Sequence, residues 1–221
     1  ALAAPYVLKK GSKLSYWGGL IFSDQANKLL VDEINAWQAR QRRQLELRFV
    51  NDYHDDAGYI DALAASVQSH WQAHGRPDRL LLSFHGIPER NIRLGDPYET
   101  QCRRTAMQLI ERLQWREDAW NVTFQSRFGR AAWLQPYTEP TLRELGRRGV
   151  GRVDVLCPGF PADCLETLEE IAMEGRAAFL DSGGKAFHYI PALNDASAWI
   201  TALAGIAERH LSGWPTRGEV G

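Results

Sequence analysis

The sequence predicts an α/β fold in which a mostly parallel sheet carries helices on both faces. Short apolar runs, several of them rich in β-branched residues, alternate with longer segments whose apolar residues recur every three or four positions. Glycines stand at Gly75, Gly149 and Gly183–Gly184, where the helical segments should end. Alternation of strands and helices favours parallel pairing with crossover helices.

Five strands are predicted from short β-rich runs that are bounded by turn residues. They begin with LELRFVND, which alternates apolar and polar residues, and continue with RLLLSFHG, whose consecutive leucines indicate a strand buried on both faces. NVTFQSRFG, RVDVLCPGF and KAFHYIPAL complete the set, each ending near glycine or proline. The predicted strands span 45–52, 79–86, 121–129, 152–160 and 185–193.

Helical spacing of apolar residues predicts the segments between these strands. The predicted helices span 59–74, 97–113, 139–148, 163–180 and 195–211, with a further helix over 24–43. The region around GSKLSYWGGL matches no regular element, and the tail 212–221 is expected to fray.

Composition limits the classes of function. The chain has 221 residues, 44% hydrophobic and 24% charged, with a formal net charge of −1, so nothing indicates nucleic acid as a partner. Its three cysteines form no CxxC pair, which argues against a disulfide framework and against a four-thiolate cluster. We therefore expect a reducing, cytoplasmic setting. The sequence contains no apolar run long enough to span a bilayer.

The strand LLLSF ends on an ionisable residue, His85, which Gly86 and Pro88 follow at once. In open α/β sheets, sites form beyond the carboxyl ends of the strands. Gln125–Ser126 and the CPGF segment at 157–160 should reach the same edge, which makes a shared pocket credible. A histidine hydrogen-bonded within a turn is the structural alternative.

The segment DCLETLEEI places Asp163, Glu166 and Glu170 on one helical face. Asp163 and Glu166 also have the spacing of a capping box, and acidic residues suit a first helical turn without any further role. Glu170 lies one turn deeper, where capping does not apply.

Three aromatic residues, Tyr98, Trp133 and Phe160, lie in turn-rich contexts away from regular apolar stripes. They either wall a pocket for a flat ligand or cap the core.

Four segments, SFHGIPERNIRLGDPYETQC, TFQSRFGRAAWLQPYTE, CPGFPADCLETLEEI and YIPALN, resemble in order and spacing the signature segments of the ferrochelatase family. The resemblance extends from about residue 45 to residue 211. It implies a Rossmann-like, chelatase-type three-layer αβα fold, and insertion of Fe2+ into protoporphyrin IX, the last step of haem biosynthesis. The chain resembles the bacterial form of the family, and we expect neither an iron–sulfur cluster nor another tightly bound cofactor.

The resemblance also implies roles for single residues. His85 and Glu166 match the catalytic pair that face each other across the porphyrin, with His85 a proton acceptor or a metal ligand. Asp163 and Glu170 match acidic neighbours on a path for metal or protons, so His85, Glu166, Glu170 and Asp163 are the expected metal ligands. Expected porphyrin contacts are Tyr98, Ser126, Trp133 and Phe160. Cys164 stands where some relatives have a second histidine.

The family has two similar lobes, and the chain is expected to hold the second at 45–211. Residues 1–44 then form a divergent remnant of the connection to a missing first lobe, and 212–221 a flexible tail. Two alternatives remain: a chelatase for cobalt or nickel and another tetrapyrrole, or an inactive porphyrin-binding fragment. Expected partners are protoporphyrin IX and ferrous iron; peripheral contact with a membrane, and a monomer or a homodimer, are left open.

Overall fold

The sheet of the protein, in a computed structural model, has four parallel strands. The structure describes residues 8–10, 13–15, 24–42, 48, 50–127 and 129–214. The strands are β3 (Arg79–His85), β4 (Trp120–Gln125), β5 (Arg152–Leu156) and β6 (Ala186–Ile190), in the spatial order β4-β3-β5-β6. The predicted α/β class is therefore confirmed.

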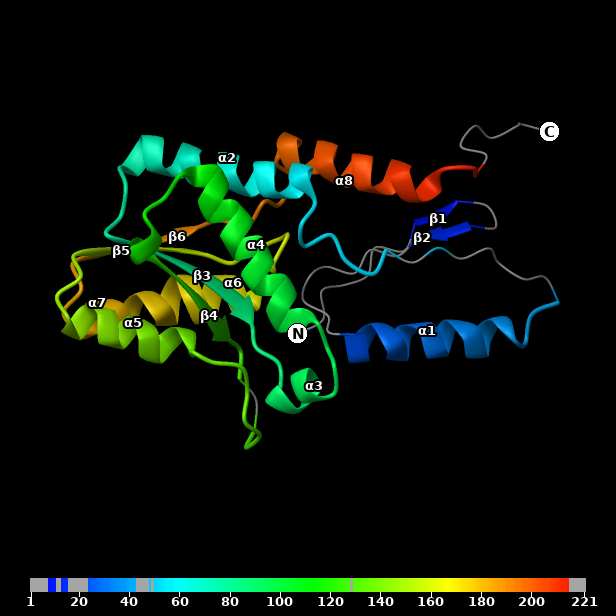
Figure 1. The fold of residues 1–221 in the computed structure, drawn as a ribbon, viewed down its shortest axis with the longest axis horizontal. Coiled ribbons are helices and arrows are strands. Elements are labelled where there is room, and N and C mark those ends of the chain that lie inside the picture. Colours follow the sequence, from blue (N-terminus) through cyan, green and yellow to red (C-terminus); the bar gives the residue numbers. More distant parts are fainter. Residues whose placement is uncertain are drawn as a thin grey trace.

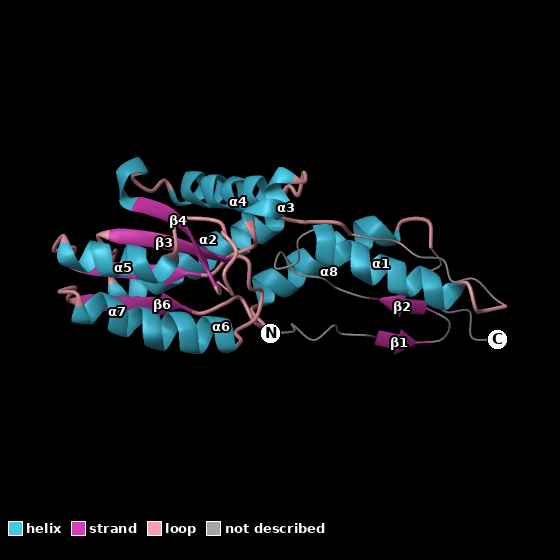
Figure 2. Ribbon diagram, turned by 90° about the horizontal axis from the view of Figure 1, so that it is seen from below, coloured by secondary structure: helices cyan, strands magenta, loops and turns pink. Residues whose placement is uncertain are grey.

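Helices cover both faces of the sheet and bury two separate apolar cores (Figures 1 and 2). One face carries α2 (Ala57–His74), α4 (Tyr98–Leu113) and α8 (Ser197–Leu211). The other carries α5 (Thr138–Arg147) and α7 (Arg176–Asp181). Successive residues of β3 serve the two cores in turn, since Leu80 and Leu82 face α2 and α4 whereas Leu81 faces α5 and α7. This explains the uninterrupted leucines of the strand.

The chain order creates a switch point between β3 and β5. After β3 the chain passes through α4 to β4, on one side of the sheet order, and after β5 it passes to β6 on the other side. The two connections also lie on opposite faces, because α4 packs into one core and α7 into the other. Crevices that bind ligands form at such points, outside the carboxyl ends of the strands. His85 ends β3 here.

Most predicted elements agree with the structure to within a few residues, apart from the first strand. Within the predicted span 45–52, residues 45–47 and 49 lie outside the described part, and the described residues 48 and 50–52 form no strand. The predicted N-terminal helix is α1 (Asp24–Gln38), beyond a short hairpin of β1 (Leu8–Lys10) and β2 (Lys13–Ser15). The strands β1 and β2 were not predicted, and neither were α3 (Glu89–Arg93) and the 3-10 turn η1 (Glu117–Ala119).

The predicted helix over 163–180 is divided into three parts. It begins as α6 (Leu165–Thr167), continues as the π-helix η2 (Leu168–Gly175) and ends as α7. The predicted capping box of Asp163 and Glu166 is wrong. Cys164 is the N-cap, and Thr167 is its partner, since the Thr167 hydroxyl accepts the Cys164 backbone N–H at 3.0 Å. Asp163 lies one residue before the cap and does not bond with Glu166; its carboxylate accepts from Thr167, Tyr189 and Asn194 instead.

Within the described ranges, the structure contains no helix that is both long and apolar enough to cross a bilayer.

Candidate active site at the carboxyl edge of the sheet

His85 is held by its own strand and turn, with its ring partly exposed. Its Nδ1 lies 2.6 Å from the carbonyl oxygen of Gly86, and its backbone carbonyl accepts a hydrogen bond from the Tyr98 hydroxyl at 2.9 Å. Because a carbonyl oxygen can only accept, Nδ1 must carry the proton. In the neutral ring the other nitrogen, Nε2, has the lone pair, with which it can accept a proton or bind a metal.

Gly86 is required beside this histidine because the chain approaches β4 closely. Its amide donates to the Gln125 carbonyl at 2.7 Å, and a Cβ at this position would lie 2.9 Å from that same oxygen. Any side chain at residue 86 would push β3 and β4 apart where they end. Glycine therefore fixes the position from which the His85 ring projects.

Gln125 connects three strands to the segment 163–170, called here the acidic segment because it carries Asp163, Glu166 and Glu170. Its side chain is 3% exposed; Oε1 accepts from the Ser83 hydroxyl at 2.7 Å and lies 3.4 Å from the Cys157 sulfur. Its Nε2 donates to the backbone carbonyl of Glu166 at 2.8 Å. Since Gln125 pairs with His85 across β3 and β4, this one side chain links the positions of His85 and Glu166. Sequence reasoning placed Gln125 at this edge but assigned it no role.

Ser126 and Glu170 form a closed pair. The backbone N–H and the hydroxyl of Ser126 donate to the two carboxylate oxygens of Glu170 at 2.7 and 2.6 Å. Ser126 has φ +61°, a left-handed conformation that costs a non-glycine residue energy unless its surroundings hold it. The charge-assisted bonds from Glu170 supply that restraint.

Changing Glu170 to glutamine is expected to lower the free energy of unfolding by about 1–2 kcal/mol, because both bonds to Ser126 lose their charged acceptor. Urea unfolding measures the loss, and amide hydrogen exchange at Ser126 should become faster. The matched control is Glu169→Gln, at an exposed neighbouring position, which should leave both measurements unchanged. Equal effects of the two substitutions would refute the assigned role of Glu170.

Asp163 accepts several hydrogen bonds around its carboxylate. The Tyr189 hydroxyl donates at 2.6 Å, the Asn194 side-chain amide at 2.8 Å and the Thr167 hydroxyl at 3.1 Å. Burial alone would raise the pKa of Asp163, but these bonds and one from the Ala192 amide outweigh it, so the pKa lies below its ordinary value. The pKa of Tyr189 is raised, mainly by burial and also by its hydrogen bond to Asp163.

The depressed pKa of Asp163 predicts the sign of a pH dependence. A group with a lowered folded-state pKa contributes its stability above its unfolded pKa of about 3.9, and loses it as the pH falls through the folded value. Asp163→Asn should therefore cost about 1–2 kcal/mol at pH 7, and less as the pH falls below 3.9. Urea unfolding across this pH range tests the expectation. Asp195→Asn, at an exposed site, is the control; a pH-independent cost at residue 163 would contradict the assignment.

The four predicted metal ligands lie along the edge and not around one point. Among the described residues, His85, Glu166, Glu170 and Asp163 do not form a group whose ligand atoms all lie within 4.8 Å of one another. Glu170 is bonded to Ser126 and Asp163 to Tyr189, whereas Glu166 is partly exposed on α6. Within the described part of the chain, the structure thus does not bring these four side chains together as one metal centre.

The predicted aromatic residues divide into buried and accessible ones. Tyr98 and Phe160 are 1% and 2% exposed, so they belong mainly to the two cores, although the Phe160 ring centre lies 6.3 Å from that of His85. Trp133 is partly exposed, with its ring centre 6.4 Å from the His85 ring. The structure thus brings Trp133 and Phe160 close to the histidine ring, and the Tyr98 hydroxyl bonds to the histidine backbone.

The fold places the chain among the chelatase-type α/β proteins. The structure of CbiX, described as the terminal enzyme for biosynthesis of sirohaem in denitrifying bacteria, has a TM-score of 0.55 to this chain. The alignment covers 85% of this chain and 70% of that one at 17% sequence identity, so it supports the fold alone.

The chain belongs to the ferrochelatase family. The family model for ferrochelatase matches residues 21–211. The ferrochelatase of Methylibium petroleiphilum is 61% identical over 188 residues, covering 85% of this chain and 52% of that protein. The ferrochelatase of Polaromonas sp. is 56% identical over 196 residues (89% and 53%), and that of Dechloromonas aromatica 58% identical over 191 (85% and 52%). The chain thus spans about half the length of the curated relatives it matches.

Proposed function

We propose that the chain carries the catalytic half of a ferrochelatase, which inserts Fe2+ into protoporphyrin IX to form haem. The observation that carries this proposal is that the family match spans the whole carboxyl edge, where His85 and the segment of Glu166 are joined through Gln125. The proposed catalytic residues are His85 and Glu166. The proposed porphyrin contacts are Tyr98, Ser126, Trp133 and Phe160, of which Ser126 and Trp133 are accessible at the edge whereas Tyr98 and Phe160 are buried behind it. His85, Glu166, Glu170 and Asp163 are the proposed ligands on the metal path.

The reaction requires groups of this kind. A porphyrin must lose two pyrrole protons to receive the ion, and Nε2 of His85 has the free lone pair to accept one or to ligate the metal briefly. Carboxylate oxygens attract Fe2+ without retaining it as thiolates would, which suits delivery. Aromatic side chains near His85 can hold the macrocycle bent, so that the nitrogen lone pairs point out of its plane.

The same proposal covers partners and setting. We infer a cytoplasmic protein that takes Fe2+ and protoporphyrin as substrates and holds no iron–sulfur cluster, since Cys102, Cys157 and Cys164 provide fewer thiolates than a four-cysteine cluster needs. Residues 45–211 form the proposed C-terminal lobe, with 1–44 a connection and 212–221 a tail. An apolar substrate also makes peripheral membrane contact reasonable, in a monomer or a homodimer.

The decisive experiment compares the chain alone with the chain supplied with the first half of the Methylibium ferrochelatase. Haem formation from Fe2+ and protoporphyrin is followed without oxygen by absorbance, and porphyrin binding by quenching of protein fluorescence. Turnover in the reconstituted pair supports ferrochelatase. Tight porphyrin binding without turnover of any metal, in both forms, selects the inactive binding fragment. Faster insertion of cobalt or nickel into another tetrapyrrole selects the other chelatase.

A further inference from the structure

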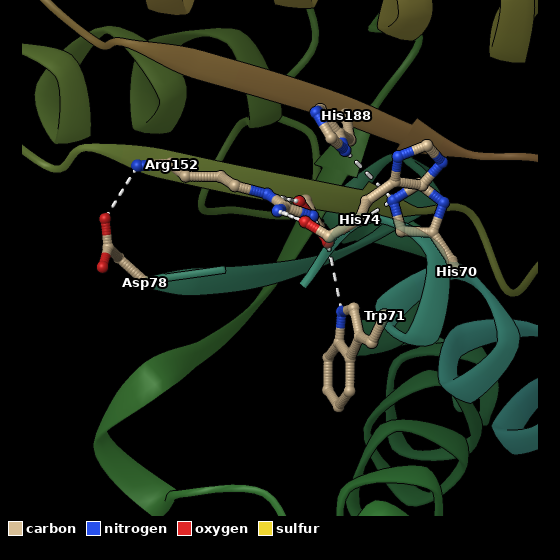
Figure 3. A network of polar contacts seen from close by, with 7 residues as sticks. His70, Trp71, His74, Asp78, Arg152 and His188 are labelled. Atoms are coloured by element: carbon tan, nitrogen blue, oxygen red, sulfur yellow. Dashed lines mark hydrogen bonds and ion pairs between the residues drawn. The ribbon is translucent and has the colours of Figure 1, made fainter. Parts of the chain in front are cut away.

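A second group of metal-binding side chains lies away from the carboxyl edge. It consists of His70 on α2, Asp154 on β5 and His188 on β6, and the ligand atoms of these three residues all lie within 4.8 Å of one another. Figure 3 shows a ring nitrogen of His70 directed toward one of His188, with His74 beside them. Asp154 is fully buried, at 0% exposure, in a strand whose other residues are apolar or at its end.

The position of this group differs from that of His85 in two ways. Asp154 pairs with Leu80, five residues before His85 on β3, which corresponds to about 16 Å along a strand. Asp154 also faces α2, since Trp71 of that helix donates to its carboxylate. His85 is an odd number of residues from Leu80 along β3, so its side chain projects from the opposite face of the sheet. The two groups are separate sites.

The distances between the side chains fit chelation. The Nε2 of His70 lies 3.2 Å from the Nδ1 of His188 and 3.6 Å from the Oδ2 of Asp154. Two ligands bound tetrahedrally to a zinc ion at about 2.05 Å stand about 3.3 Å apart. The ion therefore fits between these atoms with little movement of the backbone. His74 adds a third imidazole, its ring centre 4.6 Å from that of His70 and 5.1 Å from that of His188.

The surroundings of the group prepare its ligands for a metal. Arg152 donates to both carboxylate oxygens of Asp154 at 2.8 and 3.0 Å, and the Trp71 ring N–H donates at 3.1 Å, which fixes the carboxylate. The positive charge of Arg152 offsets that of the carboxylate, so binding should be weaker than in closed structural zinc sites.

We propose that His70, His188 and Asp154, with His74 as an added ligand, form a second divalent-metal site that clips α2 to β5 and β6. Imidazole nitrogens with one carboxylate oxygen suit Zn2+, Co2+ or Ni2+, and the partly exposed rings allow the ion to exchange with solvent. The site is independent of the proposed chelatase activity, because it touches neither His85 nor the acidic segment.

The test uses the whole chain, freed of metal with a chelator, and Zn2+ and Co2+ as probes. It starts from the double variant His85→Ala/Glu166→Gln, which removes the side-chain ligands of the two proposed catalytic residues. Calorimetry with Zn2+ should give one equivalent in this background, and adding His188→Gln or His70→Gln should weaken binding at least about 10-fold. Co2+ should give visible absorption bands that the same additions abolish. His210→Gln, an exposed histidine on α8, is the control and should change nothing.

Two further measurements keep the outcome clear. Circular dichroism and urea unfolding in chelator should show that the glutamine variants fold, and Zn2+ should raise the Tm of the starting protein but not of these variants. The proposal is overturned if no Zn2+ binds to the folded double variant, or if its affinity survives both His70→Gln and His188→Gln. Chelatase activity affects none of these readouts, so its failure would be seen separately.

Discussion

Replacing His85 with alanine is expected to lower the rate of iron insertion by about 100-fold to 10,000-fold, the range lost when a positioned acid or base is removed. The fold should persist, because the ring of His85 is partly exposed and its Nδ1 contacts only the adjacent Gly86 carbonyl. The measurement is haem formation by the reconstituted pair described above, at saturating porphyrin, alongside urea unfolding.

Two controls define the meaning of that loss. His210→Ala changes an exposed histidine on α8 and should retain full activity. Glu166→Gln keeps the backbone carbonyl that Gln125 binds, so its effect reports on the carboxylate alone. If His85→Ala retains more than about a tenth of the wild-type rate, His85 neither accepts the proton nor carries the metal.

Replacing Gln125 with leucine is expected to destabilise the protein by about 2–4 kcal/mol, although the two side chains have similar volume. The substitution removes the donor to the Glu166 carbonyl in a part-buried setting. It also removes one of the two partners of the buried Ser83 hydroxyl, whose other partner is the Thr138 hydroxyl. Urea unfolding measures the loss. Activity should fall as well, because the start of the acidic segment loses its anchor on β4.

The comparison for this change is Gln72→Leu on the exposed face of α2, which should shift the free energy of unfolding by less than about 0.5 kcal/mol. A small cost at Gln125, similar to that at Gln72, would show that the network around Gln125 is not what joins the strands to the acidic segment.

The central part of the sheet could be predicted from local patterns. The leucines of 80–82 have no polar alternation because β3 is flanked by strands on both sides and by helices on both faces. The break at Gly86 and Pro88 likewise marks the strand end correctly. Such features depend on residues close together in the chain, and the periodicity of apolar residues reveals them.

Features that depend on distant partners could not be predicted. Gln125 and Glu166 are 41 residues apart, and nothing in either local sequence indicates that they bond. The helix cap at Cys164 was missed because cysteine is not among the usual capping residues. A signal for Asp154 was present, since a carboxylate inside the apolar run VDVL requires a buried partner, and that signal was overlooked.

The π-helix η2 makes the candidate site sensitive to a change in the length of the chain at this point. Its backbone bonds join residues five apart, so each turn holds more residues than the α-helical turns before and after it. Deleting a single residue within 168–175 would let the segment return to α-helical bonding and would rotate α6 relative to α7. Glu170 lies within this stretch, so its bond with Ser126 depends on the segment keeping its length. The length of this segment is therefore as important as its acidic residues for the position of Glu170 in the candidate site.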